Sequence, residues 1–181
     1  MSKIAVFFAT GYEEIEALTV VDLCRRAKIE TEMISVTGED SVTGSHGIAV
    51  TMDKQFEEVD FDSLDMIVLP GGMPGTKNLE AHQGLMEQLD RFYKEGRGVA
   101  AICAAPSIFG HRGYLKGRNA CAYPGFESHL ENAKVSENSV EVSEHVITGR
   151  GMGCAIDFGL AIVERFCGKE AAQDLAKGII Y

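Results

Sequence analysis

Two hydrophobic patterns alternate along this chain. Some short runs are apolar throughout, which is typical of buried strands, whereas longer segments carry apolar residues every three or four positions, which is typical of amphipathic helices. The apolar runs predict strands at residues 3–9 (KIAVFFA), 65–72 (DMIVLPGG) and 98–103 (GVAAIC). The periodic segments predict helices at residues 13–29, 82–96 and 153–166, with a last helix starting near Gly168.

Weaker signals fill the spaces between these elements. They predict further strands at residues 30–37 and 47–53, the latter in a hairpin-like excursion after Gly44, a short helix at 105–113, and strands around 119–123, 139–143 and 145–149. Buried strands that alternate with helices predict an α/β sandwich of the doubly wound kind, with a mostly parallel sheet and helices on both faces. No repeat or linker interrupts residues 1–181, so we expect a single domain.

Composition narrows the classes of function. Hydrophobic residues make up 45% and charged residues 24% of the 181 positions, as in ordinary globular proteins. The net charge of −10 without a basic cluster disfavours binding to nucleic acid or to anionic membranes. No apolar run reaches membrane-spanning length, and nothing resembles an export signal.

The five scattered cysteines suit a reducing compartment, so we expect a cytoplasmic protein without disulfides. The five histidines stand apart, and no ligand spacing predicts a metal site.

The carboxyl ends of parallel strands are where such sheets build sites, and Cys103 follows one of them. The chain must turn there from a strand into a helix, with the small residues Ala101 and Ala105 two positions away on either side and Pro106 at a first helical position. Such an elbow exposes the thiol near a helix N-terminus, which favours the thiolate. The alternative is a buried cysteine within a strand.

The stretch VLPGG favours the elbow. Gly71 and Gly72 end a neighbouring buried strand, where the absence of side chains lets backbone amides approach a ligand. One amide from Gly72 and one from the elbow residue Cys103 could together hold a developing oxyanion.

Three glutamates open the first predicted helix. Capping of the helix N-terminus explains such residues in general. Glu16, however, shares an apolar face with Val20, Leu23 and Ala27, which predicts a partly buried carboxyl with a raised pKa. Glu13 borders the same face, so spacing alone does not choose between the two. Glu14 aligns with Leu18, Val21 and Arg25, and Arg25 is its predicted partner on the solvent side.

Four stretches together resemble the DJ-1 (ThiJ-like) branch of the DJ-1/PfpI superfamily: GYEEIEALTVVDLCRRA, DMIVLPGGMPG, GVAAICAAP and TGRGMGCAIDFGLAIVERFCGKEAA. They cover nearly the whole chain in order. The resemblance implies a flavodoxin-like sandwich that forms a homodimer and needs no cofactor. It matches Cys103 to the reactive cysteine, Glu16 rather than Glu13 to the acid that hydrogen-bonds the sulfur, and Gly72 to the glycine whose amide lies close to it.

The resemblance also suggests residues around the reacting group. Gly71, Ala104, Tyr123 and Arg150 are the expected substrate-binding residues, and Arg26 matches an arginine near the dimer interface.

Some positions depart from related patterns. Ala104 replaces the histidine that follows the cysteine in the protease-like branch, which argues against peptidase activity. Tyr123 stands before Pro124 where human-type members have histidine, and a tyrosine is a poor base near pH 7. His46 stands where those members tend to have arginine, which predicts a weaker anion site.

Two functions fit these residues. In the first, the protein is a glutathione-independent glyoxalase or deglycase that acts on small α-oxoaldehydes such as methylglyoxal, or on their early adducts, through Cys103 and Glu16. In the second, it is a redox-responsive protein or holdase in which Cys103 is oxidised to sulfinate without turnover.

Two further classes are disfavoured. A class I glutaminase would need a His-x-Glu pair, and the candidate His145 has an isoleucine two positions on. The glycines of GRGMGCAIDFG do not form a dinucleotide-binding fingerprint, so we expect no nucleotide cofactor.

Overall fold

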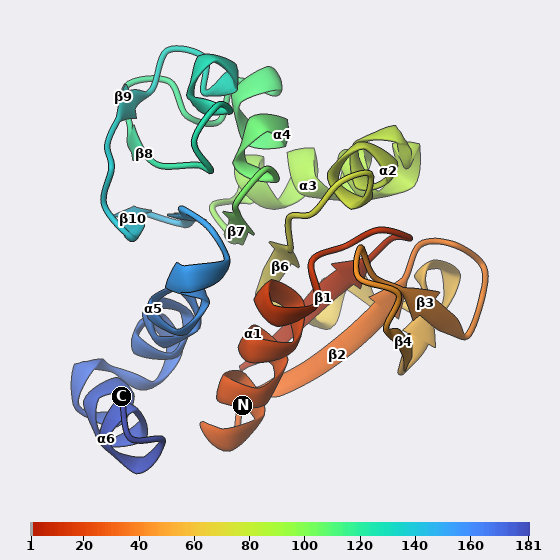
Figure 1. The fold of residues 1–181 in the computed structure, drawn as a ribbon, viewed down its shortest axis with the longest axis horizontal. Helices are drawn as coiled ribbons and strands as arrows, with labels where there is room; N and C mark the ends of the chain where they lie inside the picture. Colours follow the sequence, from red (N-terminus) through yellow and green to blue (C-terminus); the bar gives the residue numbers. More distant parts are fainter. Residues whose placement is uncertain (1) are drawn as a thin grey trace.

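A seven-stranded sheet forms the centre of the computed structural model, which describes residues 2–181 (Figure 1). The strand order is β10-β11-β7-β6-β1-β2-β5, and all neighbouring strands are parallel except β10 and β11. The strands are β1 (Lys3–Phe8), β2 (Glu30–Ser35), β5 (Lys54–Gln55), β6 (Met66–Leu69), β7 (Gly98–Ile102), β10 (Val140–Ser143) and β11 (Val146–Gly149).

The order of the five main parallel strands is that of flavodoxin-like folds. Taken along the chain, β1, β2, β6, β7 and β11 lie in the order 2-1-3-4-5, so the direction of winding reverses between β1 and β6. Ligand sites of such sheets lie at the carboxyl ends of the strands beside this reversal. The predicted α/β class is therefore confirmed, and the loops after β1, β6 and β7 meet at one edge.

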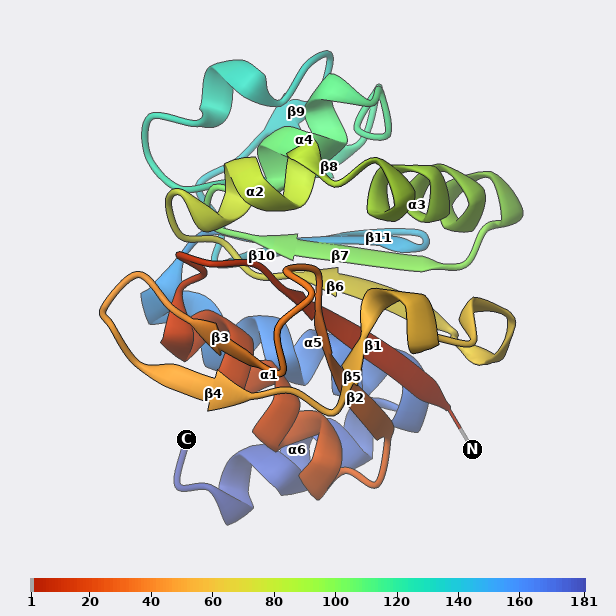
Figure 2. The same cartoon turned by 90° about the vertical axis from the view of Figure 1, so that its right-hand side faces the viewer.

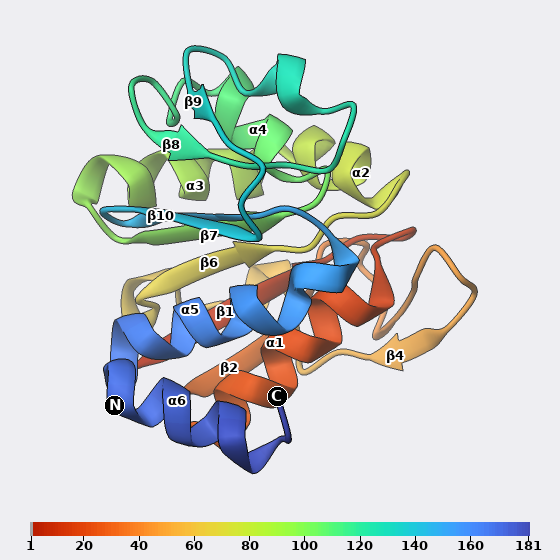
Figure 3. The ribbon, with the colours of Figure 1, turned by 60° about the vertical axis from the view of Figure 1, so that its left-hand side comes forward.

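Six helices cover the two faces of the sheet (Figure 2). One face carries α2, α3 and α4, and the other carries α1, α5 and α6, with α1 packed beside α5 (Figure 3). The helices are α1 (Glu14–Arg26), α2 (Gly75–Ala81), α3 (Gln83–Glu95), α4 (Pro106–His111), α5 (Ala155–Cys167) and α6 (Lys169–Gly178).

The sheet separates two hydrophobic cores. Phe7, Leu69 and Phe92 belong to the core under α2–α4, whereas Phe8 and Phe158 belong to the core under α1 and α5. Neighbouring residues of β1 therefore supply opposite cores, and both must be apolar. This is why the strand appears in the sequence as a continuous apolar run rather than an alternating one.

Helix α3 shows how directly the pattern predicts structure. Its buried residues Leu85, Met86, Leu89 and Phe92 form one stripe at helical spacing. The helix ends at Gly96, whose φ of 72° lies in the left-handed region that glycine adopts without a Cβ penalty.

Several short elements were not predicted. Helix α2 has a single buried apolar side chain of any size, Leu79, which leaves no periodicity to detect. The hairpin-like excursion is confirmed as the pair β3 (Ser41–Thr43) and β4 (Ala49–Thr51). Strand β8 (Asn119–Ala120), which the sequence predicted around residues 119–123, pairs with the unpredicted strand β9 (Lys134–Val135) in a small separate sheet. Short 3-10 helices occupy Phe56–Glu58, Phe61–Ser63, Glu127–His129 and Met152–Cys154. Within residues 2–181, no helix is both long and apolar enough to cross a bilayer.

The packing of α5 on the sheet predicts a large loss of stability for Phe158→Ala. The Phe158 side chain is fully buried, so truncation removes its burial and leaves a cavity, which lowers the free energy of unfolding by about 3–5 kcal/mol. Urea denaturation measures this change. The control Val142→Ala, at an exposed position of β10, is expected to stay within about 0.5 kcal/mol of wild type. A loss below about 1 kcal/mol for Phe158→Ala would contradict this packing.

Candidate active site

Cys103 lies at a sharp turn between β7 and α4. Its φ of 67° is in the left-handed region, an unusual and strained conformation for a residue with a side chain. Its backbone is held on both sides, because Cys103 N–H donates to Gly149 O at 2.9 Å and Cys103 O accepts from Tyr123 N at 2.9 Å. The predicted elbow is therefore present, and the cysteine is not simply part of the strand.

Small residues make this turn possible. Ala101 and Ala105 are fully buried, and Pro106 opens α4 as expected. Gly71 packs directly against Cys103 and Glu16. A Cβ on Gly71 would lie only 2.6 Å from Cys103 Cβ and 2.7 Å from Glu16 Oε2. Glycine at this position thus lets the loop after β6 lie against both side chains.

The Glu16 carboxyl is buried beside Cys103. The residue is 1% exposed, and its Oε2 accepts a hydrogen bond from Gly71 N at 2.9 Å. Its Oε1 is buried without a nitrogen or oxygen partner, and the carboxyl interacts with the Cys103 thiol. An unpaired buried carboxylate oxygen is unfavourable, so this arrangement favours a proton shared with the sulfur.

The pKa values of the two groups follow from that burial. Desolvation raises the pKa of Glu16 to about 7, although the contacts with Cys103 and Gly71 oppose the shift. Burial and the negative charge of Glu16 also raise the pKa of Cys103. The two groups therefore titrate as a pair. Contrary to the expectation from the sequence, the helix N-terminus does not lower the pKa of Cys103 overall. A thiolate therefore requires that the thiol proton passes to the Glu16 carboxylate.

Two backbone amides face the sulfur. The backbone N–H groups of Gly72 and Ala104 lie beside the Cys103 sulfur and lower its pKa, against the larger effect of burial. The predicted use of the Cys103 amide is wrong, because that N–H is already bonded to Gly149 O within the sheet edge. Ala104 takes its place beside Gly72.

Tyr123 and Arg150 lie together in one pocket. They line a shallow cavity of about 330 Å³ together with Pro124 and residues 151–154. The Tyr123 side chain is half exposed and lies over Gly151, and Arg150 Nη1 donates to Glu137 O at 3.2 Å. The backbone N–H of Tyr123 donates to Cys103 O, so the residue lies next to the elbow.

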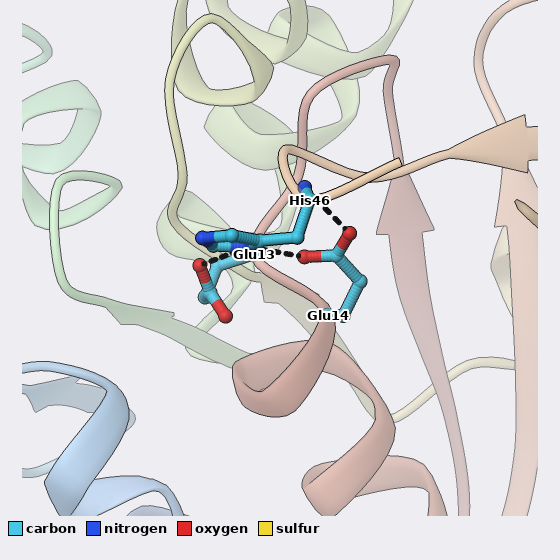
Figure 4. Close-up of side chains that lie close together, drawn as sticks. All are labelled: Glu13, Glu14 and His46. Carbon is cyan, nitrogen blue, oxygen red and sulfur yellow. Dashed lines mark hydrogen bonds and ion pairs between the residues drawn. The ribbon is translucent and has the colours of Figure 1, made fainter. Parts of the chain in front are cut away.

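Glu14 was predicted to lie on the solvent side of the helix, but it is buried. It is 4% exposed and hydrogen-bonds the loop after β3: Oε1 accepts from His46 N at 2.8 Å, and Oε2 lies 3.0 Å from His46 Nδ1 (Figure 4). Burial opposes ionisation, but the hydrogen bonds from His46 and backbone amides outweigh it and lower the pKa of Glu14 to about 2. Arg25 instead pairs with Asp53 at 2.6 Å. The contact between Glu14 and His46 was not predicted, because the two residues are 32 positions apart in the sequence.

His145 is remote from the cysteine. It precedes β11, and Val146 at the start of that strand pairs with Val99 at the start of β7. Cys103 follows the opposite end of β7. This placement agrees with the rejection of a glutaminase-like thiol activated by His145.

The coupled pair predicts a distinctive pH profile for alkylation of Cys103. Glu16 loses its proton as pH rises through about 7, and its carboxylate can then accept the thiol proton, so the alkylation rate rises through that range. In Glu16→Gln that step is absent, because no carboxylate is left to accept the proton. In Glu13→Gln the step stays but moves to lower pH, since Glu13 contributes a negative charge that raises the pKa of Glu16. Mass spectrometry of the alkylated peptide gives the rates, and an unchanged step in Glu16→Gln would contradict the pairing.

Known proteins match this chain over nearly its full length. Protein dj-1beta of Drosophila melanogaster is 36% identical over 184 residues, covering 99% of this chain and 98% of that protein. A protein named as a deglycase from Pyrococcus abyssi is 32% identical over 142 residues, covering 77% of this chain and 83% of its own. The solved structure of oxidized DJ-1 from Toxoplasma gondii superposes with a TM-score of 0.95 at 35% identity, covering 100% of this chain and 99% of that one.

The model of the DJ-1/PfpI family matches residues 2–165, the part of the chain that includes Glu16, Gly71, Gly72 and Cys103. With this match and the full-length relatives, the chain belongs to the DJ-1/PfpI family.

Proposed function

We propose that this protein is a cysteine-dependent enzyme that converts small α-oxoaldehydes such as methylglyoxal, or their early adducts, without glutathione and without a cofactor. The proposal rests on the groups that surround the Cys103 sulfur. These are the buried Glu16 carboxyl, with a pKa near 7, and two backbone amide N–H groups. A relative named as a deglycase supports enzyme activity within the family.

The first step forms a covalent adduct. The Cys103 thiolate attacks the aldehyde carbon, and the C=O electron pair moves to its oxygen. The Gly72 and Ala104 amides, which face the sulfur, stabilise the resulting oxyanion, and protonation gives a hemithioacetal.

Glu16 then moves protons. Its carboxylate removes the proton from the former aldehyde carbon to form an enediol and returns a proton to the neighbouring carbon, which leaves a thioester on Cys103. Water hydrolyses the thioester to lactate and restores the thiol. The overall change is methylglyoxal plus water to lactate, with no external oxidant. A carboxyl with a pKa near 7 suits both proton steps at neutral pH.

The same donors suit a second role. A sulfinate on Cys103 would be held by a protonated Glu16 and by the amides of Gly72 and Ala104, so oxidation without turnover is the competing proposal. A solved relative is described as oxidized, which supports this alternative for the family. Production of lactate separates the two roles, because a redox sensor does not form it.

We expect the purified, metal-stripped protein to form many lactates per chain from methylglyoxal without glutathione. Cys103→Ser should fall to the background rate, and Glu16→Gln should lower kcat by about 10²–10⁴-fold because proton transfer is lost. Cys167→Ser removes an exposed thiol elsewhere and should keep full activity. Lactate must be quantified directly, since any thiol consumes aldehyde reversibly. Equal lactate from wild type and Cys103→Ser would reject the enzyme and favour the redox role.

We also propose that the protein forms a homodimer through the exposed side of α1. A groove of about 530 Å³ there is lined by Ile15 and Leu18 of α1, by Ile48 of the loop between β3 and β4, and by Ile156 and Ile179. Arg26 and Asp22 lie on the same face. A patch that carries both charges around apolar residues is self-complementary, as a two-fold interface requires.

Ile48→Glu is expected to shift wild-type dimer to monomer, because it places a charge among apolar groups at this face. Val142→Glu changes an equally exposed residue on β10 and should leave the dimer intact. Sedimentation equilibrium measures the masses. A monomeric wild type, or loss of the dimer only in Val142→Glu, would contradict the assignment.

A further inference from the structure

Four side-chain atoms beside the entrance to α1 converge on one point (Figure 4 shows three of the four residues). His46 Nδ1 lies 3.0 Å from Glu14 Oε2, 3.4 Å from Glu13 Oε2 and 3.1 Å from Ser45 Oγ. Ser45 Oγ lies 3.3 Å from the same oxygen of each glutamate. The ligand atoms of the two glutamates and the histidine all lie within 4.8 Å of one another.

Five of the six separations between these four atoms lie between 3.0 and 3.4 Å, close to the edges of a tetrahedral ligand set. A tetrahedron with edges near 3.3 Å has its centre about 2.0 Å from each corner, which is the length of zinc bonds to imidazole nitrogen and carboxylate oxygen. We propose that Glu13, Glu14 and His46 bind a zinc ion, with the Ser45 hydroxyl at the fourth corner. The ion takes the place of the proton that His46 Nδ1 shares with Glu14.

Backbone contacts already orient the two carboxylates toward this point. Glu14 Oε1 accepts from His46 N at 2.8 Å, and Glu13 Oε1 accepts from Ile15 N at 3.5 Å. Each glutamate therefore keeps its Oε2 for the shared centre, as outer contacts do in known metal sites. Gly44 lets the loop close over this group, since a Cβ there would lie 2.3 Å from the Glu14 carboxyl.

Charge and access also suit a divalent cation. Among residues 2–181, neither Glu13 nor Glu14 forms an ion pair with a lysine or an arginine, so the pair offers two negative charges. The Glu13 and Glu14 side chains are 13% and 5% exposed, whereas His46 is 68% exposed and opens the site to solvent. An imidazole ligand and four-fold geometry favour zinc over magnesium or calcium, which prefer six or more oxygen ligands.

The test is zinc binding by the full chain, measured against a chromophoric chelator in a Cys103→Ser background so that this thiol does not contribute. We expect one zinc ion per chain. X-ray absorption should show a shell of nitrogen and oxygen at about 2.0 Å without the sulfur distance of about 2.3 Å. Glu13→Gln and His46→Arg should each weaken binding at least about tenfold. His46→Arg keeps a positive partner for Glu14 and so separates loss of the ligand from loss of the fold.

His129→Ala is the matched control, because His129 and His111 form a close pair of imidazoles away from the proposed site, with Nδ1 of His129 3.0 Å from Nε2 of His111. It should bind zinc as tightly as the background protein. Circular dichroism confirms that each variant is folded. No zinc binding, a sulfur shell, unchanged affinity in His46→Arg, or a loss confined to His129→Ala would each overturn the proposal. Lactate formation by the metal-stripped protein tests the proposed enzyme separately, so the two can fail independently.

Discussion

The contact between the buried Glu16 carboxyl and the Cys103 sulfur is the constraint on which the rest of the site depends. Glu16 comes from the first turn of α1 and Cys103 from the turn after β7, and Gly71 lies between them. The reversal of strand order between β1 and β6 brings these three segments to one edge of the sheet. The strained turn at Cys103 is held by backbone bonds to Gly149 and Tyr123, so the fold determines where the sulfur lies.

Two carboxyls only two residues apart acquire opposite properties. Glu14 is buried against donors, namely His46 and backbone amides, and its pKa falls to about 2. Glu16 is buried with one amide and a thiol, and its pKa rises to about 7. Helical geometry turns the two side chains to different faces of α1, so one helix start supplies both a permanent anion and a proton carrier. In our account the first suits a cation and the second suits proton transfer.

Features that depend on local sequence were predictable. The apolar runs of β1, β6 and β7 and the stripe of α3 predicted the sheet and its helices, because burial on both faces leaves a direct signal in the sequence. The apolar face containing Glu16 predicted a buried carboxyl, and the small residues around Cys103 predicted an elbow. The family resemblance was needed to choose Glu16 over Glu13.

Features that depend on distant loops were not predictable. The partner of Glu14 is His46, which the β3–β4 hairpin brings back to the start of α1, and no spacing in the sequence encodes that contact. The partner of the Cys103 amide is Gly149 of β11, so Ala104 rather than Cys103 faces the sulfur together with Gly72. Tyr123 and Arg150 follow from the resemblance alone; they line one shallow cavity, where the Tyr123 side chain lies over Gly151.

Infrared difference spectroscopy tests the shared proton most directly. The carbonyl stretch of a protonated carboxyl is distinct from that of a carboxylate, and subtracting the spectrum of Glu16→Gln isolates the signal of Glu16. The account predicts a protonated Glu16 at pH 6 that ionises with a midpoint near 7. A Glu16 that is fully ionised at pH 6 would contradict the proton sharing on which the site and its proposed chemistry rest.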